Sequence, residues 1–310
     1  ARAVWYGFRM TAKPAFEGRI LRLFDTGHRE EDRVLQELRA IGCEVWARDP
    51  QTGKQFGCQH FGGHLRGHMD AVVKGLPEAP KAPHLVDVKT CNSRKFADVI
   101  RDGMQSVYPK YWIQAQGYMG QFGLHRGMYI FVCKDNDQIH TERFHFDDKA
   151  YKTALGKAER IICADAPPDR LSHDPAWYEC KFCPYNGHCH GTQAPDVTCR
   201  SCVHATPERG GAWTCARHHK QLSADDQVRA CCDHRYIPAM LHWAEAVDAS
   251  EAGNWIKYRL KTGGYFTNGQ PPEGLESGEI HACRDKAGLA MMEGDAVASL
   301  REIFDARVVE

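Results

Sequence analysis

The segment His-Leu-Val-Asp-Val-Lys at residues 84–89 constrains the fold of this chain more than any other. Successive side chains of a strand point to opposite faces, so Asp87 and Lys89 share one face while Val86 and Val88 share the other. One face therefore seeks an apolar core, and the other carries a carboxylate beside an ammonium. Burying these charges is costly unless they are paired or hold a metal ion. The pattern predicts a core strand with a charged, metal-binding face.

The composition indicates a globular chain. It has 310 residues, 43% of them hydrophobic, and a formal net charge of zero. This length allows one large domain with appendages or two domains. No apolar run approaches the roughly 20 residues needed to cross a bilayer, so we expect no membrane partner. Without a net positive charge, nucleic-acid binding must rest on local patches. Lys89, Arg94, Lys95 and Arg101 form one candidate, the alternative being a solvated helix face.

The hydrophobic pattern predicts alternating helices and strands up to residue 163. The expected elements are a helix at 27–42, strands at 43–47, 64–73 and 85–90, a helix at 110–122, strands at 128–133 and 139–146, and a helix at 147–163. Asp25 or Thr26 would cap the first helix. On that helix, His28 and Glu31 share the buried face with Leu35, as a capped helix start or as part of a site.

Three motifs follow one another through this region: Gly-His-Met-Asp ending at Asp70, Asp87-x-Lys89, and Gln114-x-x-x-Tyr118. Residues four apart on a helix lie on one face, as the glutamine and tyrosine would. With the histidine-bearing first helix, this order resembles the PD-(D/E)XK nuclease superfamily. Within it the sequence is most similar to the RecB-like branch, which includes the lambda-exonuclease and YqaJ-type phage recombination nucleases and the CRISPR-associated RecB-like exonucleases. The resemblance covers about residues 15–190.

The resemblance implies an α/β (α+β) restriction-endonuclease-like core, in which helices flank a central mixed sheet. The ligands of one or two divalent cations would be His28, Asp70, Asp87 and the backbone carbonyl of Val88, with Glu31 as a further candidate. Lys89 would position or deprotonate the attacking water and neutralise the scissile phosphate. Gln114 and Tyr118 would hold the DNA backbone and orient the site, and so join Asp70, Asp87 and Lys89 as catalytic residues.

The chemistry of phosphodiester hydrolysis agrees with these ligands. The reaction builds negative charge on the attacking, non-bridging and leaving oxygens. Hard oxygen ligands hold the Mg²⁺ or Mn²⁺ that offsets this charge and activates water. A histidine ligand shifts the preference somewhat toward Mn²⁺. Asp87 stands where the superfamily more often has glutamate. Because aspartate is one methylene shorter, the metal would lie nearer the strand or be reached through a bridging water.

Cysteine spacing predicts metal sites rather than disulfides. Eight of the 14 cysteines lie between residues 180 and 232, and their CxxC pairs in a long chain favour thiolate ligands in a reducing compartment. Cys180, Cys183 and Cys189 resemble the three-cysteine arm that, in CRISPR-associated and AddB-type nucleases, joins an upstream cysteine to hold a [4Fe-4S] cluster. The fourth ligand would lie just before Ala1 or be a histidine such as His188 or His190. Zinc and a cluster are both open.

A second set of cysteines has the spacing of a four-thiolate zinc ribbon. Its expected ligands are Cys199, Cys202, Cys215 and Cys232, which would hold a structural Zn²⁺. The sequence does not separate Cys232 from its neighbour Cys231. Histidines that offer substitutes are His204, His218, His219 and His234. The remaining cysteines are expected to be small buried residues: Cys43, Cys58, Cys91, Cys133, Cys163 and Cys283.

We therefore expect three regions: a nuclease core at 1–178, a cysteine-rich metal-binding region at 179–236, and a small α+β region at 237–310. The last would contain a hairpin from 255 that ends at Asn268-Gly269 and a helix at 285–305. The predicted function is a metal-dependent DNA nuclease, an exonuclease of phage or bacterial recombination and repair. It would act on linear or single-stranded DNA in the cytoplasm of a bacterium or phage-infected host, beside an annealing protein or helicase.

Two further expectations stand beside this one. A ring-shaped oligomer, as in the lambda-exonuclease branch, is compatible with the sequence. The alternative function is a catalytically inactive, metal-stabilised module that binds DNA or protein on a nuclease scaffold.

Overall fold

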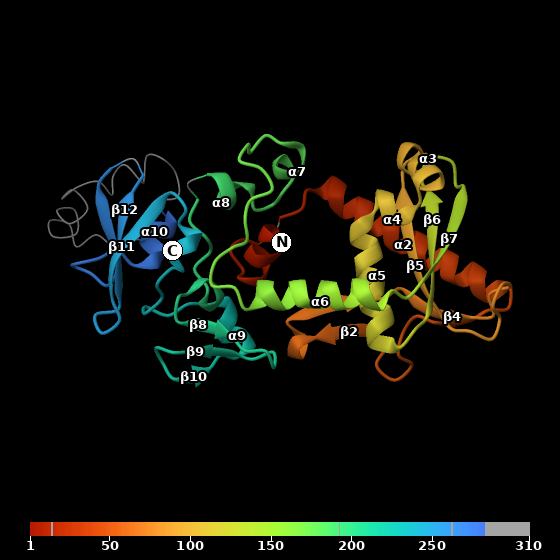
Figure 1. Ribbon diagram of the computed structural model, residues 1–310, viewed down its shortest axis with the longest axis horizontal. Helices are drawn as coiled ribbons and strands as arrows, with labels where there is room; N and C mark the ends of the chain where they lie inside the picture. Colours follow the sequence, from red (N-terminus) through yellow and green to blue (C-terminus); the bar gives the residue numbers. More distant parts are fainter. Residues whose placement is uncertain (14, 192, 262, 283–310) are drawn as a thin grey trace. The chain divides into compact units, whose positions relative to one another are not determined.

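The computed structural model describes residues 1–13, 15–191, 193–261 and 263–282 (Figure 1). The chain divides into two compact units, which we call the sheet unit, Ala15–Glu159, and the cysteine-rich unit, Ala1–Pro14 with Arg160–Glu310. This division differs from the three expected regions, because the N-terminal segment and residues 160–178 belong with the cysteines. The helix expected at 285–305 and Cys283 lie outside the described residues.

The sheet unit is a mixed α/β fold. Its elements are α2 Gly18–Ala40, β1 Glu44–Trp46, β2 Gly57–His60, the 3-10 turn Phe61–Gly63, β3 Leu65–His68, β4 Ala71–Lys74, β5 His84–Cys91, α3 Ser93–Asp102, α4 Met104–Val107, α5 Pro109–Phe122, β6 Arg126–Cys133, β7 Ile139–His145 and α6 Asp148–Ile162, which crosses the boundary of the unit. The central sheet has the order β1-β4-β5-β6-β7. Only β5 and β6 run parallel, so the sheet is mixed.

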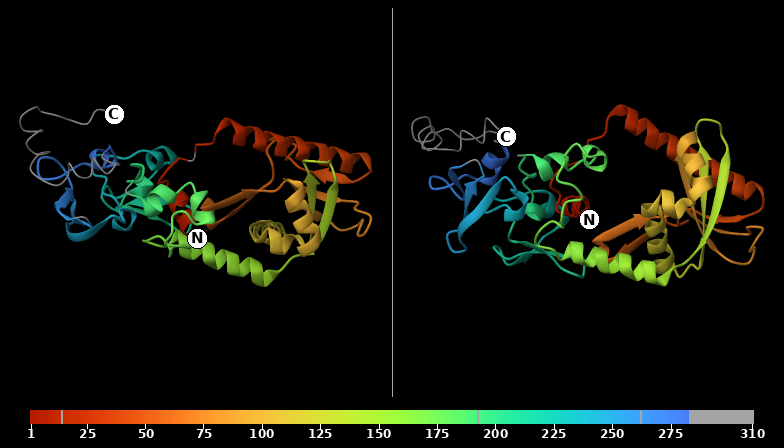
Figure 2. Two further views of the ribbon diagram at one scale, coloured as in Figure 1. Left: turned by 90° about the horizontal axis from the view of Figure 1, so that it is seen from above. Right: turned by 45° about the horizontal axis from the view of Figure 1, so that its top comes forward.

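Each face of this sheet is covered by helices. Val86 and Val88 of β5 pack with α2 in one core cluster, while Leu85 and Cys91 join α3, α4 and α5 in another. The left view of Figure 2 shows the red α2 and the yellow helices on opposite sides of these strands. The alternation read from the sequence is therefore confirmed. Both valines lie in the hydrophobic core beneath α2, while Asp87 faces the α5 side.

Several elements depart from the expected bounds. Helix α2 begins at Gly18, so Asp25 and Thr26 lie inside it and do not cap it. The single strand expected at 64–73 is two strands in different sheets, because β3 pairs with β2 and β4 pairs with β1 and β5. Residues Met69 and Asp70 form the break between them. Helices α3 and α4 were not predicted, although Asn92 caps α3 by accepting a hydrogen bond from the N–H of Lys95.

The cysteine-rich unit is built from short elements. They are α1 Arg2–Phe8, α7 Tyr178–Lys181, α8 Asn186–His190, β8 Ala205–Pro207, β9 Trp213–Cys215, β10 Lys220–Gln221, α9 Ala224–Val228, β11 Ala244–Ser250, β12 Trp255–Leu260, β13 Tyr265–Asn268 and α10 Ser277–Ala282, with 3-10 turns at Cys199–Ser201 and Pro238–Met240. Two three-stranded sheets have the orders β10-β9-β8 and β11-β12-β13. The expected hairpin is confirmed by the antiparallel β12–β13 pair, to which β11 adds an unpredicted third strand.

The cysteines outside the two predicted metal sites are mostly buried, as expected. Cys43, Cys58, Cys91 and Cys133 lie in the two cores of the sheet unit. Cys163 is exposed just beyond α6, so its predicted burial is wrong. Among the described residues, every cysteine is a free thiol, and no helix is both long and apolar enough to cross a membrane.

Candidate functional site

Asp70, Asp87 and Lys89 converge at the middle of the central sheet. The Lys89 ammonium donates a hydrogen bond to Oδ1 of Asp87, lies 3.7 Å from Oδ2 of Asp70, and donates to the carbonyl of Val88 at 3.3 Å. The Asp87 side chain is almost completely buried, whereas Asp70 and Lys89 are partly exposed. The structure therefore brings together the three residues on which the sequence prediction depended.

Strand register explains this convergence. Strands β4 and β5 are antiparallel with Ala71 opposite Val86, so Asp70 lies one position beyond the pairing and opposite Asp87. There, Oδ2 of Asp70 accepts a hydrogen bond of 2.8 Å from the N–H of Val88. The Asp70 side chain thus accepts a hydrogen bond from the β5 backbone at the point where the backbone pairing of β4 with β5 ends. Its carboxylate is fixed beside the Asp87–Lys89 pair.

The site carries more negative than positive charge. Burial raises the pKa of Asp87 to about 7, with the Lys89 charge opposing the rise and Asp70 adding to it. Burial alone would lower the pKa of Lys89, but pairing with Asp87 and Asp70 raises it above its ordinary value. Burial also raises the pKa of Glu31, and the charge of Asp70 adds to that rise. Three carboxylates thus share one ammonium.

Glu31 on helix α2 lies close enough to this charge cluster to interact with Asp70 and Lys89. Glu31 is half-buried, accepts a hydrogen bond of 3.1 Å from Nε2 of Gln55, and is stabilised in its charged form by His28. His28 itself is exposed rather than on the buried face. No three ligand atoms drawn from His28, Glu31, Asp70 and Asp87 lie all within 4.8 Å of one another in the described part of the chain.

The two α5 residues expected to hold DNA differ in exposure. Gln114 is exposed and donates a 2.7 Å hydrogen bond from Nε2 to the hydroxyl of Tyr118, which is only 3% exposed. Burial raises the pKa of Tyr118 to about 12, with a contribution from the Asp87 charge. Gln114 is thus placed to contact a ligand, while Tyr118 is placed to hold Gln114. Reasoning from sequence did not make this distinction.

One aromatic residue at the site was not predicted. The Lys89 ammonium lies 5.4 Å from the ring centroid of Tyr111, at cation–π distance. The hydroxyl of Tyr129 donates a 2.7 Å hydrogen bond to the carbonyl of Tyr111. Tyr111 precedes Gln114 by three positions and Tyr118 by seven, so helical spacing on α5 was a signal that pointed to it.

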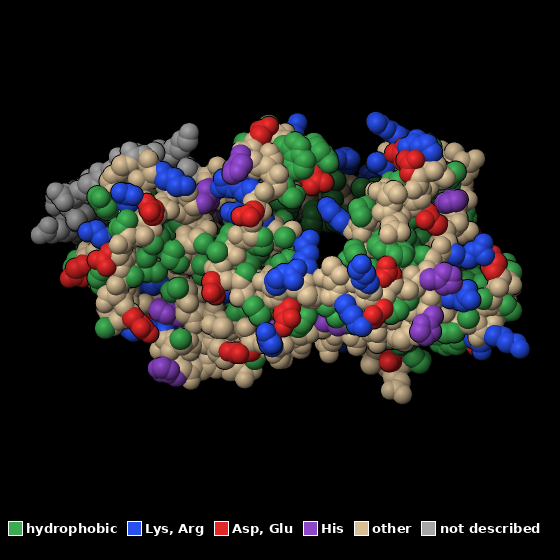
Figure 3. Space-filling view, viewed as in Figure 1, with side chains coloured by type: hydrophobic (Ala, Val, Ile, Leu, Met, Phe, Trp, Pro, Cys, Tyr) green, Lys and Arg blue, Asp and Glu red, His purple; other side chains and the backbone are tan. Residues whose placement is uncertain are grey.

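The basic patch expected after β5 is largely neutralised. Lys95 and Arg101 of α3 pair with Asp98 at 3.2 and 2.9 Å, and Arg101 also pairs with Asp102 at 2.6 Å. Figure 3 shows basic and acidic side chains side by side over α3. Arg94 is exposed, whereas Lys89 belongs to the charge cluster described above. The patch is therefore a mixed, solvated helix face.

The first predicted cysteine arm lies on α7, α8 and the turn between them. Desolvation, followed by repulsion from Cys189 and Cys183, raises the pKa of Cys180, which indicates that the three thiols lie near one another. Nδ2 of Asn186 fixes the turn by donating a 2.6 Å hydrogen bond to the carbonyl of Cys180. His188 is buried and its Nδ1 lacks a hydrogen-bond partner within the described residues.

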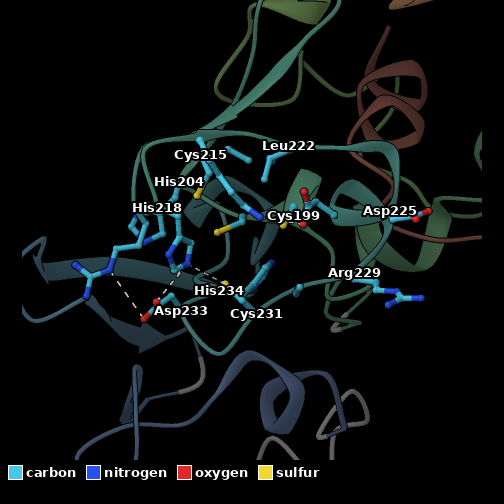
Figure 4. A pocket seen from close by; sticks show the side chains of 16 residues that line it. Cys199, His204, Cys215, His218, Leu222, Asp225, Arg229, Cys231, Asp233 and His234 are labelled. Atoms are coloured by element: carbon cyan, nitrogen blue, oxygen red, sulfur yellow. Dashed lines mark hydrogen bonds and ion pairs between the residues drawn. The ribbon is translucent and has the colours of Figure 1, made fainter.

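The second set of cysteines surrounds a cavity of ≈ 490 Å³ in the cysteine-rich unit (Figure 4). Cys199, Cys202, Cys215 and Cys231 line it. The expected ligand set named Cys232, which the sequence does not separate from Cys231; the structure places Cys231 at the cavity.

Comparison with known proteins gives weak likenesses only. No protein-family model and no curated protein matches the chain. Among solved structures, a protein named SSO0001 has a TM-score of 0.32 at 18% identity and covers 52% of this chain and 66% of its own. The alkaline exonuclease LHK-Exo from Laribacter hongkongensis has a TM-score of 0.33 at 16% identity and covers 51% of this chain and 84% of its own. Its complex with dAMP gives the same score and identity over 52% of this chain. At these scores the likeness carries no weight for function, which rests on the residues.

Proposed function

We propose that the sheet unit is a divalent-metal-dependent DNA nuclease with a PD-(D/E)XK core, acting as an exonuclease in phage or bacterial recombination and repair. The observation that carries the proposal is the placement of Asp70 opposite Asp87, with Lys89 between the two carboxylates and Glu31 on the neighbouring helix. A purely structural ion pair needs one carboxylate for one ammonium. This site has an excess of negative charge beside the ammonium, which is the charge pattern of a cation-binding nuclease centre.

The donor set fits Mg²⁺ or Mn²⁺. Carboxylate oxygens and the carbonyl of Val88 are hard ligands, and a partly exposed site leaves room for the waters that Mg²⁺ retains. Asp70, Asp87 and Glu31 would hold the ion, with His28 as the residue that would favour Mn²⁺. When bound, such an ion supplies a nucleophilic hydroxide and offsets charge on the phosphate.

The side chains of this chain would divide the remaining work. Lys89 is held as a hydrogen-bond donor by Asp87 and the Val88 carbonyl, so its ammonium would orient the attacking water and neutralise the scissile phosphate. The exposed amide of Gln114 would contact the DNA backbone. Tyr118 would position Gln114 through their hydrogen bond, and the ring of Tyr111 would position the Lys89 ammonium. Such contacts reach phosphate rather than bases, so cleavage would be independent of sequence.

Nuclease assays with matched variants test this proposal. Purified full chain would be incubated with Mg²⁺ or Mn²⁺ and with linear duplex, single-stranded and closed circular DNA, each linear substrate labelled at one end. We expect loss of the linear substrates, no loss of circles, and inhibition by EDTA. Asp70→Asn and Lys89→Ala should lower the rate at least about a hundredfold, as loss of a charge-stabilising group does. Lys95→Ala on α3 is the matched surface control and should retain full activity.

Two outcomes would overturn this reading. Intact linear DNA after prolonged incubation with either metal ion, from folded protein, removes the enzymatic function. If that protein binds DNA without cutting it, the catalytically inactive binding module expected as the alternative would replace the nuclease.

A further inference from the structure

We propose that Cys199, Cys202, Cys215 and Cys231 bind one structural Zn²⁺ as four thiolates, and that Cys231, not Cys232, is the fourth ligand. The inference is independent of the nuclease activity, because every residue it uses belongs to the cysteine-rich unit. Sequence spacing alone leaves the two adjacent cysteines equivalent. The distinction between them, and the reason for a metal at this place, come from the structure.

Three separate segments bring the four thiols to one cavity. Cys199 begins a 3-10 turn and Cys202 directly follows it. A reciprocal Thr198–Ser201 capping box fixes this turn, and the N–H of Cys202 donates to the carbonyl of Cys199 at 3.1 Å. Cys215 ends strand β9, and Cys231 follows α9. Figure 4 shows the labelled sulfurs of Cys199, Cys215 and Cys231 on the lining of the same space. A turn, a strand end and a loop that converge in this way form a ribbon-type metal site.

Burial and backbone donors act in opposite directions on the pKa of two of these sulfurs. Burial raises the pKa of Cys202 to about 12, while backbone N–H groups of Arg235 and His204 hydrogen-bond its sulfur and oppose the rise. Burial also raises the pKa of Cys231, opposed by the N–H of Asp233. In both cases a donor lies two residues after the cysteine, so Cys202 and Cys231 occupy matching loops. The cavity lining, which includes Cys231 and not Cys232, assigns the fourth position to Cys231.

The charge around the cavity suits a tetrathiolate centre. Four thiolates with one Zn²⁺ carry a net charge of minus two, which needs nearby cations in a partly buried place. The Lys220 ammonium pairs with Asp226 at 3.0 Å, which does most to raise the pKa of Lys220, and the charges of Cys199 and Cys215 add to that rise. Nε2 of His218 lies 3.4 Å from the sulfur of Cys231. An ammonium and an imidazole thus lie beside the thiols.

A competing ligand set shares Cys231. Among the described residues, the one trio of candidate ligand atoms that all lie within 4.8 Å of one another is His218, Cys231 and Asp233. The Asp233 carboxylate, however, already accepts a 3.0 Å hydrogen bond from Asn254 and faces Arg217 at 3.9 Å. That trio would also leave three thiols at the cavity unused. Four thiolates require these sulfurs to draw inward, to Zn–S distances of about 2.3 Å.

The small size of the local core explains why a metal is needed. In the described part of the chain, the buried apolar cluster around β8, β9 and β10 consists of Ala205, Trp213 and Leu222 with Cys202 and Cys215, and Phe8 packs against it. A core this small contributes too little free energy to hold three short strands without an additional link. Zinc binding would supply that free energy, as it does in other structural zinc sites.

The test compares two adjacent substitutions in the full chain. Metal content would be measured by elemental analysis, and Co²⁺ would replace Zn²⁺ so that the thiolate-to-metal absorption band reports bound sulfurs. Cys231→Ser should lose about one zinc per chain and the band should weaken. Cys232→Ser, its matched neighbour, should keep both. Cys231→His keeps a ligand in place and should retain the metal with a changed Co²⁺ spectrum, which separates ligand loss from misfolding.

The contrary outcomes are equally definite. Loss of metal in Cys232→Ser with retention in Cys231→Ser would reverse the assignment. Loss in His218→Ala with retention in Cys199→Ser would transfer the site to the competing trio. Equal metal content in wild type, Cys231→Ser and Cys199→Ser would remove the site. Cys183→Ser, which lies on the other cysteine arm, shows how much of the total metal belongs elsewhere.

Discussion

Gly67 lies against the ring of Tyr118, which holds the proposed DNA-contact residue Gln114, and an added methyl group there is predicted to disturb the site. A Cβ at Gly67 would lie 2.7 Å from Cε1 and 2.8 Å from the hydroxyl oxygen of Tyr118. An ordinary contact is about 3.4 Å or more, so one partner must move by roughly 0.7 Å. The ring is 3% exposed and bonded to Gln114, which leaves it little room to turn away.

The expected cost of Gly67→Ala is that of overpacking a well-filled core. Such insertions lower the free energy of unfolding by about 1–3 kcal/mol. The matched control is Gly117→Ala on α5, where nothing lies within 4 Å of the added Cβ. That change should raise stability by about 0.5–1 kcal/mol, because alanine is the better helix former. The two substitutions add the same atoms with opposite effects.

Urea unfolding of metal-free protein, followed by circular dichroism, measures both changes. A second measurement, the rate of DNA degradation at a temperature where all variants are folded, reports the displacement of Gln114. We expect Gly67→Ala to lower that rate and Gly117→Ala to leave it unchanged. Combining Gly67→Ala with Tyr118→Leu should cost less than the sum of the single changes, because the clash disappears. If Gly67→Ala is as stable as wild type, Tyr118 does not pack here as described.

Two further predictions concern charge and metal. Between about pH 4 and pH 7 the folded protein keeps a proton on Asp87 that the unfolded chain has released, so the contribution of this buried group to stability falls as pH rises through that window. In metal-free protein, the stability of Asp87→Asn relative to wild type should therefore increase with pH in chemical unfolding experiments, and a constant difference from pH 4 to pH 8 would contradict the raised pKa. Zinc removal by a strong chelator should increase trypsin cleavage at Arg9 about tenfold, which corresponds to about 1.4 kcal/mol of lost local stability. The reason is that the Phe8 ring lies 5.1 Å from the ring of Trp213, which belongs to the cluster around β8, β9 and β10, and Arg9 donates to the carbonyl of Ala205 at 3.1 Å. Unchanged cleavage would mean that these strands keep their structure without metal.

The parts of the fold that sequence predicted are those fixed by local periodicity. Strand β5 alternates valines with charged residues, and that alternation decides which face each side chain takes wherever the strand sits. Helix α5 begins at Pro109 and ends before Gly123, which adopts the left-handed conformation at φ 64°, so both ends had local signals. The convergence of Asp87 with Lys89 followed from the same local rule.

The parts that sequence missed depend on contacts between distant segments. The first two turns of α2 carry Leu21, Leu23 and Phe24, but these side chains are exposed rather than packed on a core, so the start of the helix at Gly18 was not marked. Whether Tyr118 faced the core or a ligand depended on the approach of Gly67 from β3, which no spacing on α5 records. Cys231 and Cys232 differ only through the loop that follows α9. Adjacent residues in irregular backbone have no fixed period from which to assign a face.

The two proposed metal sites are embedded in cores of very different size, and this difference predicts different consequences of metal removal. Asp70 and Asp87 sit on a sheet whose two faces are each packed by a large apolar cluster, so the sheet unit has the buried area to remain folded without a cation. The strands β8, β9 and β10 pack on one small cluster, in which two of the buried residues, Cys202 and Cys215, are themselves proposed ligands. Chelation that abolishes DNA cleavage should therefore leave the sheet unit folded. Loss of zinc should instead destabilise the packing of β8, β9 and β10. The catalytic cation would thus serve the reaction of the substrate, whereas the zinc would stabilise the folded state of β8, β9 and β10.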